Sequence, residues 1–116
     1  MSAGFKIAGE VYWGTNGAVE ACVEAMAALA AERFGPADPI ATYLAEQRDS
    51  FSLGRVLYLD EWLIDAPARG RFLGLLDAAG EQLLRQGTFT EYGREWMASV
   101  VPAMRAQIAA DAGPGS

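Results

Sequence analysis

Residues 9–22, GEVYWGTNGAVEAC, pass from a strand-like alternation through a glycine-rich turn into a helix. Together with the residues before it, this stretch predicts a strand over 5–13. Its expected faces are Phe5, Ile7, Val11 and Trp13 on one side, and Lys6, Ala8, Glu10 and Tyr12 on the other. Gly9 indicates a bulge or a close backbone neighbour. The segment could instead reverse at Ala8-Gly9 as a hairpin, which would add a strand.

Four helices are predicted from apolar residues at three- and four-residue spacing and from capping residues at the helix ends. Their expected starts are Thr15 or Asn16, Asp38-Pro39, Asp65-Ala66-Pro67, and Thr88 or Thr90. Their expected ends are Gly35-Pro36, Ser50, Gly87 and, for the last helix, the DAGPGS tail. Pro102 lies inside the last helix, and we expect it to kink or split that helix.

A further strand is predicted over 56–59, where the apolar run VLYL is typical of a strand covered on both faces. The order strand, helix, helix, strand, helix, helix predicts a helix-rich α+β or small α/β fold. Its core sheet has two strands, or three if the first segment forms a hairpin. The helical connection permits a parallel pair. We expect one globular domain over 1–112 and a disordered tail over 113–116.

The excess of acidic over basic side chains restricts the kinds of partner that we expect. The 116 residues carry 15 acidic and 9 basic side chains, a net charge of −6, and no cluster of Lys and Arg. Binding to nucleic acid or to an anionic membrane surface needs such a cluster, so neither is expected. A basic protein is the better partner, because opposite fields accelerate encounter. The N-terminal segment contains no signal-peptide pattern, and we expect a cytoplasmic protein.

Several reactions are not expected because their residues are missing. The chain has no His and a single cysteine, Cys22, so it cannot form a His-activated nucleophile, a His/Cys zinc site or an internal disulfide. Gly9 and Gly14 have the spacing of a phosphate-binding loop, but Thr15 stands where that loop requires Lys. We therefore expect no phosphate loop, no metal and no cofactor. Cys22 lies on the apolar face of the first helix and is interpreted as a buried thiol.

A candidate site follows from the predicted pairing of the strands. If the two strands are parallel, the residues beyond their carboxyl ends lie side by side, where open α/β sheets bind ligands. The residues so placed are Tyr12, Trp13, Thr15 and Asn16 after the first strand, and Asp60, Glu61 and Trp62 after the second. Asp60 and Glu61 could act as acid and base if both lie on a loop, or could be solvated or capping carboxylates.

Two functions are consistent with these features. The first is a non-catalytic, small acidic interaction protein that binds a macromolecular partner, with neutralisation of a basic protein as one form. The alternative is a small-molecule-binding domain or modest enzyme that uses Asp60 or Glu61 in a pocket beyond the strand ends. An unpaired strand edge would also allow a homo-oligomer.

Overall fold

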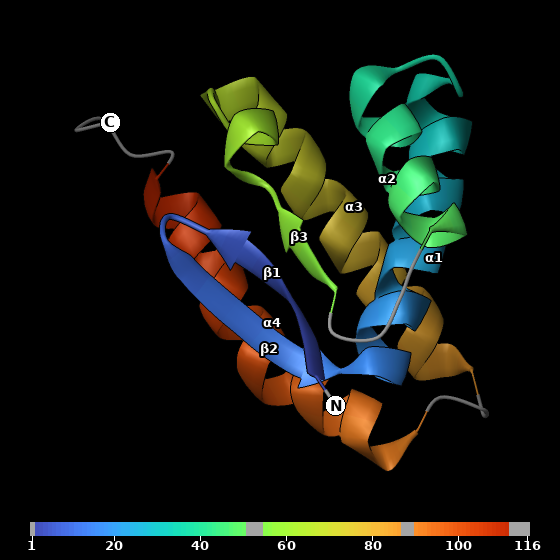
Figure 1. Ribbon diagram of the computed structural model, residues 1–116, viewed down its shortest axis with the longest axis vertical. Helices are drawn as coiled ribbons and strands as arrows, with labels where there is room; N and C mark the ends of the chain where they lie inside the picture. Colours follow the sequence, from blue (N-terminus) through green and yellow to red (C-terminus); the bar gives the residue numbers. More distant parts are fainter. Residues whose placement is uncertain (1, 51–54, 87–89, 112–116) are drawn as a thin grey trace.

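The computed structural model describes residues 2–50, 55–86 and 90–111 and has a helix-rich α+β fold (Figure 1), which confirms the predicted class. The elements are, in order, β1 (Ser2–Ile7), β2 (Glu10–Thr15), α1 (Asn16–Phe34), α2 (Pro39–Asp49), β3 (Val56–Tyr58), the 3₁₀ helix η1 (Asp60–Trp62), α3 (Ala66–Arg85) and α4 (Glu91–Asp111). In Figure 1, α4 follows β2 along one side, and α1, α2 and α3 form a group on the other side. The expected tail, 113–116, lies outside the described residues.

The first segment is a hairpin. Ala8 and Gly9 have φ values of 54° and 81°, the left-handed region that a two-residue hairpin turn of type I′ requires at both positions. β1 and β2 are antiparallel over six residue pairs, from Ser2–Thr15 to Ile7–Glu10. The hairpin alternative is therefore confirmed, and a single strand over 5–13 does not form.

The reversal changes which side chains share a face. Phe5 pairs with Tyr12, and Gly4 pairs with Trp13, and directly opposite residues point to the same face of a sheet. Trp13 thus lies on the face opposite to Phe5 and is 50% exposed. The expectation that Phe5 and Trp13 share one face is wrong, because the two-residue turn shifts the alternation by one position.

β1 is the central strand, in the order β2-β1-β3, and its pairing with β3 is parallel. Leu57 of β3 pairs with Phe5 and is fully buried, whereas Tyr58 pairs with Lys6 and is 61% exposed. The strand predicted over 56–59 is present, but the expectation that both of its faces are covered is wrong, because the helices pack on one face of the sheet only.

The covered face of the sheet supplies one side of the core. Ala3, Phe5 and Ile7 alternate along β1 and are buried. The ring of Phe5 stacks on the indole of Trp96 from α4, with centroids 6.3 Å apart and an interplanar angle of 19°. The indole also fills the space above Gly14, where a Cβ would lie 2.6 Å from Trp96 Nε1. The hairpin is thereby fixed on α4.

The helix starts agree with the predicted caps. The side chains of Thr15, Asp38, Asp65 and Thr90 accept hydrogen bonds from the backbone N–H groups of Ala18, Ile40, Ala68 and Gly93, at 3.2, 3.1, 2.8 and 3.0 Å. α1 ends at Gly35, whose φ is 91° and whose N–H donates to the carbonyl of Ala31. Gly87 and Thr88 lie outside the described residues, and α3 ends at Arg85.

α4 continues through Pro102 from Glu91 to Asp111, so the proline does not split the helix. Proline has no N–H, and α4 therefore lacks the hydrogen bond that this position would donate to the carbonyl of Ala98. No helix among the described residues is both long enough and apolar enough to cross a membrane.

We expect Gly14→Ala to lower the free energy of unfolding by about 1–3 kcal/mol, because the new methyl group would collide with the buried indole of Trp96. Urea denaturation followed by tryptophan fluorescence measures this. Gly17→Ala is the matched control, since a Cβ at Gly17 meets no heavy atom within 4 Å. Equal stability of the two variants would contradict the close packing of Gly14 and Trp96.

Candidate functional site

The structure does not bring the seven predicted site residues together. β2 runs antiparallel to β1 and β3 runs parallel to it, so the carboxyl ends of β2 and β3 lie at opposite ends of the sheet. Thr15 lies beside Ser2 at one end. At the other end, Asp60 Oδ1 accepts a hydrogen bond of 2.8 Å from the N–H of Ala8 in the hairpin turn. The expected contact between the two groups of residues is therefore wrong.

Three residues of the first group have places in the fold. Tyr12 lies on the helix-covered face of β2 and packs against the core. Thr15 caps α1, and Asn16 is the first residue of that helix. The two glycines with phosphate-loop spacing are also separated by structure, since Gly9 lies in the hairpin turn and Gly14 in β2. Trp13 is the residue of the first group whose large side chain is exposed.

Trp13 belongs to a surface that sequence reasoning did not identify. Two rows of paired residues cross the outer face of the sheet, Trp13–Gly4–Val56 and Val11–Lys6–Tyr58. We name the side chains of Lys6, Val11, Trp13, Val56 and Tyr58 the open sheet face. Lys6 Nζ lies 5.4 Å from the centroid of the Tyr58 ring, a cation–π contact. Leu57 and Leu59 are buried and Tyr58 between them is exposed, an alternation that the unbroken apolar run VLYL does not reveal in the sequence.

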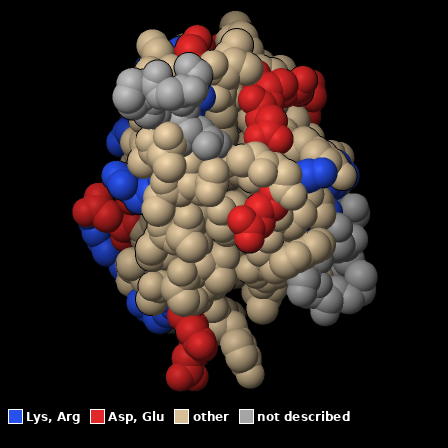
Figure 2. Space-filling model, turned by 90° about the vertical axis from the view of Figure 1, so that its left-hand side faces the viewer, with Lys and Arg blue, Asp and Glu red and all other residues tan. Residues whose placement is uncertain are grey.

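The side of the molecule where the hairpin lies carries an uncharged area. Figure 2 views the side where the hairpin and α4 lie in Figure 1, and it shows uncharged atoms over the lower left part of its centre, with acidic side chains just to the right of the middle and at the rim. The outer edge of β2 has no paired strand among the described residues. The uncharged surface beside this edge contrasts with the net charge of −6 of the whole chain.

The second group of predicted residues leads to a hollow. Glu61 and Trp62 of η1 line a space of about 400 Å³ together with the first turns of α2 and α3, and we name it the α2–α3 hollow. Its apolar walls include Ile40, Trp62 and Ile64, and Ile64 is 73% exposed. Its charged residues are Asp38, Glu61, Asp65 and Arg71. Asp60 is not among the residues that line it.

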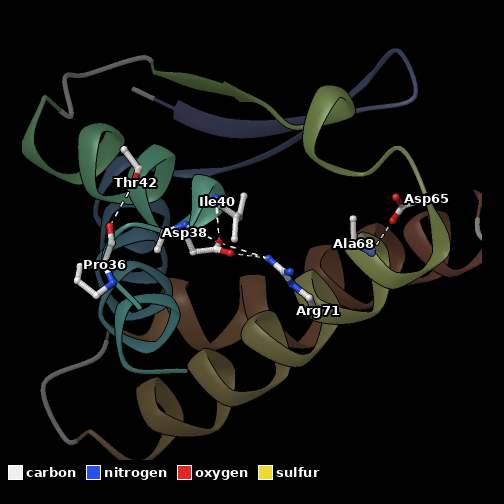
Figure 3. Close-up of polar contacts among 8 residues, drawn as sticks. Pro36, Asp38, Ile40, Thr42, Asp65, Ala68 and Arg71 are labelled. Carbon is white, nitrogen blue, oxygen red and sulfur yellow. Dashed lines mark hydrogen bonds and ion pairs between the residues drawn. The ribbon is translucent and has the colours of Figure 1, made fainter. Parts of the chain in front are cut away.

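The helix N-termini at this hollow are already occupied. Figure 3 shows Asp38 between the N–H of Ile40 and the guanidinium of Arg71, and Asp65 beside the N–H of Ala68. Arg71 Nη2 lies 3.1 Å from Asp38 Oδ1. Because the protein's own carboxylates accept from these first-turn N–H groups, the helix ends are not open to an anion.

The charge inside the α2–α3 hollow is negative. Arg71 is paired with Asp38, and its guanidinium carbon lies 4.5 Å from the centroid of the Phe34 ring. Glu61 forms no hydrogen bond or ion pair with the described residues, and Asp65 has no cationic partner among them. The hollow therefore presents two carboxylates, Glu61 and Asp65, that form no ion pair with the described residues.

An aromatic pair supports the η1 side of the hollow. The rings of Tyr43 and Trp62 have centroids 5.0 Å apart, and Tyr43 Oη donates a hydrogen bond of 3.1 Å to the carbonyl of Tyr58. Burial is the main cause that raises the pKa of the Tyr43 phenol, and the charge of Glu61 adds to it. Tyr43 thus stays a protonated donor and ties α2 to β3.

The titratable groups do not form a catalytic constellation with each other. Asp60 is bound to the amide of Ala8, whereas Glu61 lines the α2–α3 hollow, so the two do not act on one point. Within the described parts of the chain, no three Cys, Asp or Glu residues lie together in a way that could hold a metal ion. Cys22 is fully buried, and burial raises the pKa of its thiol to about 12.

Comparison with known proteins adds no family to this geometry. No protein-family model, no curated protein and no solved structure matches the chain. The open sheet face and the α2–α3 hollow are therefore the features from which a function is inferred.

Asp38 has two roles that substitutions can separate. We expect Asp38→Asn to keep the cap on α2 but lose the charge opposite Arg71, with a loss of stability within about 1 kcal/mol. Asp38→Ala loses the cap as well, for a further loss of about 1 kcal/mol. Urea denaturation of both variants and of Arg71→Gln measures the two contributions. Equal stability of Asp38→Asn and Asp38→Ala would show that the cap contributes nothing.

The buried thiol of Cys22 makes stability depend on alkaline pH. The pKa of the thiol is raised from 9.0 to about 12 in the folded state. The buried neutral thiol therefore contributes fully to the free energy of unfolding below pH 9.0, and this contribution is lost as the pH rises toward 12. We expect the unfolding free energies of the wild type and Cys22→Ala to converge over this range. The tyrosines also titrate at alkaline pH, but they are the same in both proteins and do not affect the difference. Thiol labelling of the native protein should occur only upon unfolding. A constant difference in stability, or rapid labelling, would contradict the burial of Cys22.

Proposed function

We propose that this protein is a non-catalytic binding protein whose open sheet face docks onto a protein partner. The observation that supports this most is the exposure of two large aromatic side chains, Trp13 at 50% and Tyr58 at 61%, on one uncovered face of a sheet. Tryptophan and tyrosine dominate the binding energy of protein interfaces, because they bury a large area at a small entropic cost. The hairpin backbone that presents Trp13 is fixed on α4, which reduces the cost further.

The net charge of −6 supports a basic partner, whose approach would be accelerated by the field of this chain. Neutralisation of a basic protein is one form that such binding would take. Nucleic acid and anionic membranes remain poor partners in this proposal, because the sequence has no Lys/Arg cluster. We place the protein in the cytoplasm because its single cysteine is consistent with a reducing compartment.

The α2–α3 hollow supports a second candidate function, the binding of a small molecule. Its volume of about 400 Å³ falls within the range of ligand pockets, and Glu61 at its wall could act as an acceptor or base. The separation of Asp60 from this hollow speaks against acid–base chemistry by the pair. Pairing of two copies through the free edge of β2 remains a separate prediction.

Capture from a lysate of the native cell tests the docking surface. We expect Trp13→Ala and Tyr58→Ala to weaken capture of the partner about tenfold each, because both remove exposed aromatic anchors. Tyr92→Ala is the control, since Tyr92 is 74% exposed on α4, outside the open sheet face. Thermal unfolding should show that all three variants are folded. Unchanged capture by both Trp13→Ala and Tyr58→Ala would contradict the proposal.

A further inference from the structure

We infer that the α2–α3 hollow receives the guanidinium group of an arginine side chain from the protein partner. This rests on the proposed function and extends it, because it specifies the chemistry of one partner residue. The α2–α3 hollow combines an open surface depression, an apolar wall and more carboxylates than cations in its lining, and an arginine side chain matches all three features.

The cavity and its wall suit the aliphatic part of the side chain. The space measures about 400 Å³, and Ile40, Trp62 and Ile64 contribute apolar surface to it. Ile64 is 73% exposed and therefore offers apolar surface that a bound side chain would cover. Arginine buries its methylene stem along such surfaces while its charged end reaches polar groups.

The charges select a cation. Three carboxylates and one guanidinium line the α2–α3 hollow, and the Asp38–Arg71 pair neutralises one of the carboxylates. Glu61 and Asp65 remain without a cationic partner among the described residues. An anion would meet these two carboxylates and no open helix N–H group, because Asp38 and Asp65 already accept from Ile40 and Ala68.

The shape favours arginine over lysine. The guanidinium is planar, weakly hydrated and able to donate in a fork to carboxylates while it lies on aromatic rings. The protein already holds one guanidinium at this place between a carboxylate and an aromatic ring, since Arg71 Nη2 donates to both carboxylate oxygens of Asp38 and the guanidinium lies over Phe34. Glu61 and Trp62 of η1 offer a second carboxylate and a second aromatic side chain in the lining of the hollow.

The open sheet face and the α2–α3 hollow are near each other along the chain. Tyr58 of the open sheet face is followed closely by η1, and its carbonyl accepts the hydrogen bond of Tyr43, whose ring packs against Trp62. The open sheet face and the α2–α3 hollow are therefore connected through the short segment from β3 to η1.

The test is an NMR titration of the full-length, ¹⁵N-labelled protein with N-acetyl-L-arginine amide, which stands in for the side chain in a peptide. We expect a saturable shift of the Trp62 indole N–H at millimolar probe, with the signal assigned by its loss in Trp62→Phe. Glu61→Gln should weaken the affinity about two- to fivefold, the range of an exposed ion pair. Glu20→Gln removes an equal charge from an exposed position on α1 and should leave the affinity unchanged.

Two further probes show whether binding requires the positive charge and whether the ligand is a side chain or free arginine. N-acetyl-L-citrulline amide has nearly the same shape without the charge and should bind more weakly. Equal binding of citrulline, or no saturable shift with arginine, overturns the inference. Free L-arginine that binds about tenfold more tightly than the amide would assign the hollow to a free small molecule and would also overturn it. None of these results depends on the capture experiment, so the two proposals can fail separately.

Discussion

The reversal of the chain at Ala8 and Gly9 is the constraint on which the other features depend. It takes two residues, both with positive φ, and therefore shifts the strand alternation by one position between β1 and β2. Phe5 and Ile7 then face the helices, and Trp13 faces solvent. A left-handed conformation is unfavourable for alanine by about 1–2 kcal/mol, and the hydrogen bond from its N–H to Asp60 offsets part of that cost. The end of β3 thus holds the turn in place.

The open sheet face and the α2–α3 hollow follow from helices that cover the sheet on one side only. The helices bury Phe5, Leu57 and Trp96 against one another, and the opposite face is left with Trp13, Tyr58 and Lys6. α2 and α3 begin with the capping residues Asp38 and Asp65, and the starts of these two helices form a hollow together with η1. Exposed aromatic side chains are thus gathered on the open sheet face, and carboxylates without an ion pair among the described residues are gathered at the α2–α3 hollow.

Local signals predicted the elements well, because they depend on neighbouring residues. Thr15, Asp38 and Asp65 cap helices by bonds to N–H groups two or three residues away, and those spacings are visible in the sequence. The hairpin was one of two readings, since period-two alternation alone does not show where a strand reverses. The fold class and the order of the elements were therefore predictable, but which side chains lie on each face of the sheet was not.

The candidate site was predicted less well, because it depends on pairing between distant segments. Glu61 and Trp62 do line a hollow, but Thr15 lies at the far end of the sheet, since β2 runs antiparallel to β1 whereas β3 runs parallel to it. The residues that complete the hollow, Asp38 and Arg71, are 33 positions apart and pair through the packing of α2 and α3. No local spacing carries that information.

The position of β1 has a consequence for how the protein emerges during synthesis. Of the three strands β1 is made before the other two, and its second neighbour arrives much later, because the paired residues Phe5 and Leu57 are 52 positions apart. Until β3 has been translated, the edge of β1 that later pairs with β3 is exposed in the nascent chain. Such an edge is a template for pairing with other chains, so association through strand edges is favoured during this interval of synthesis.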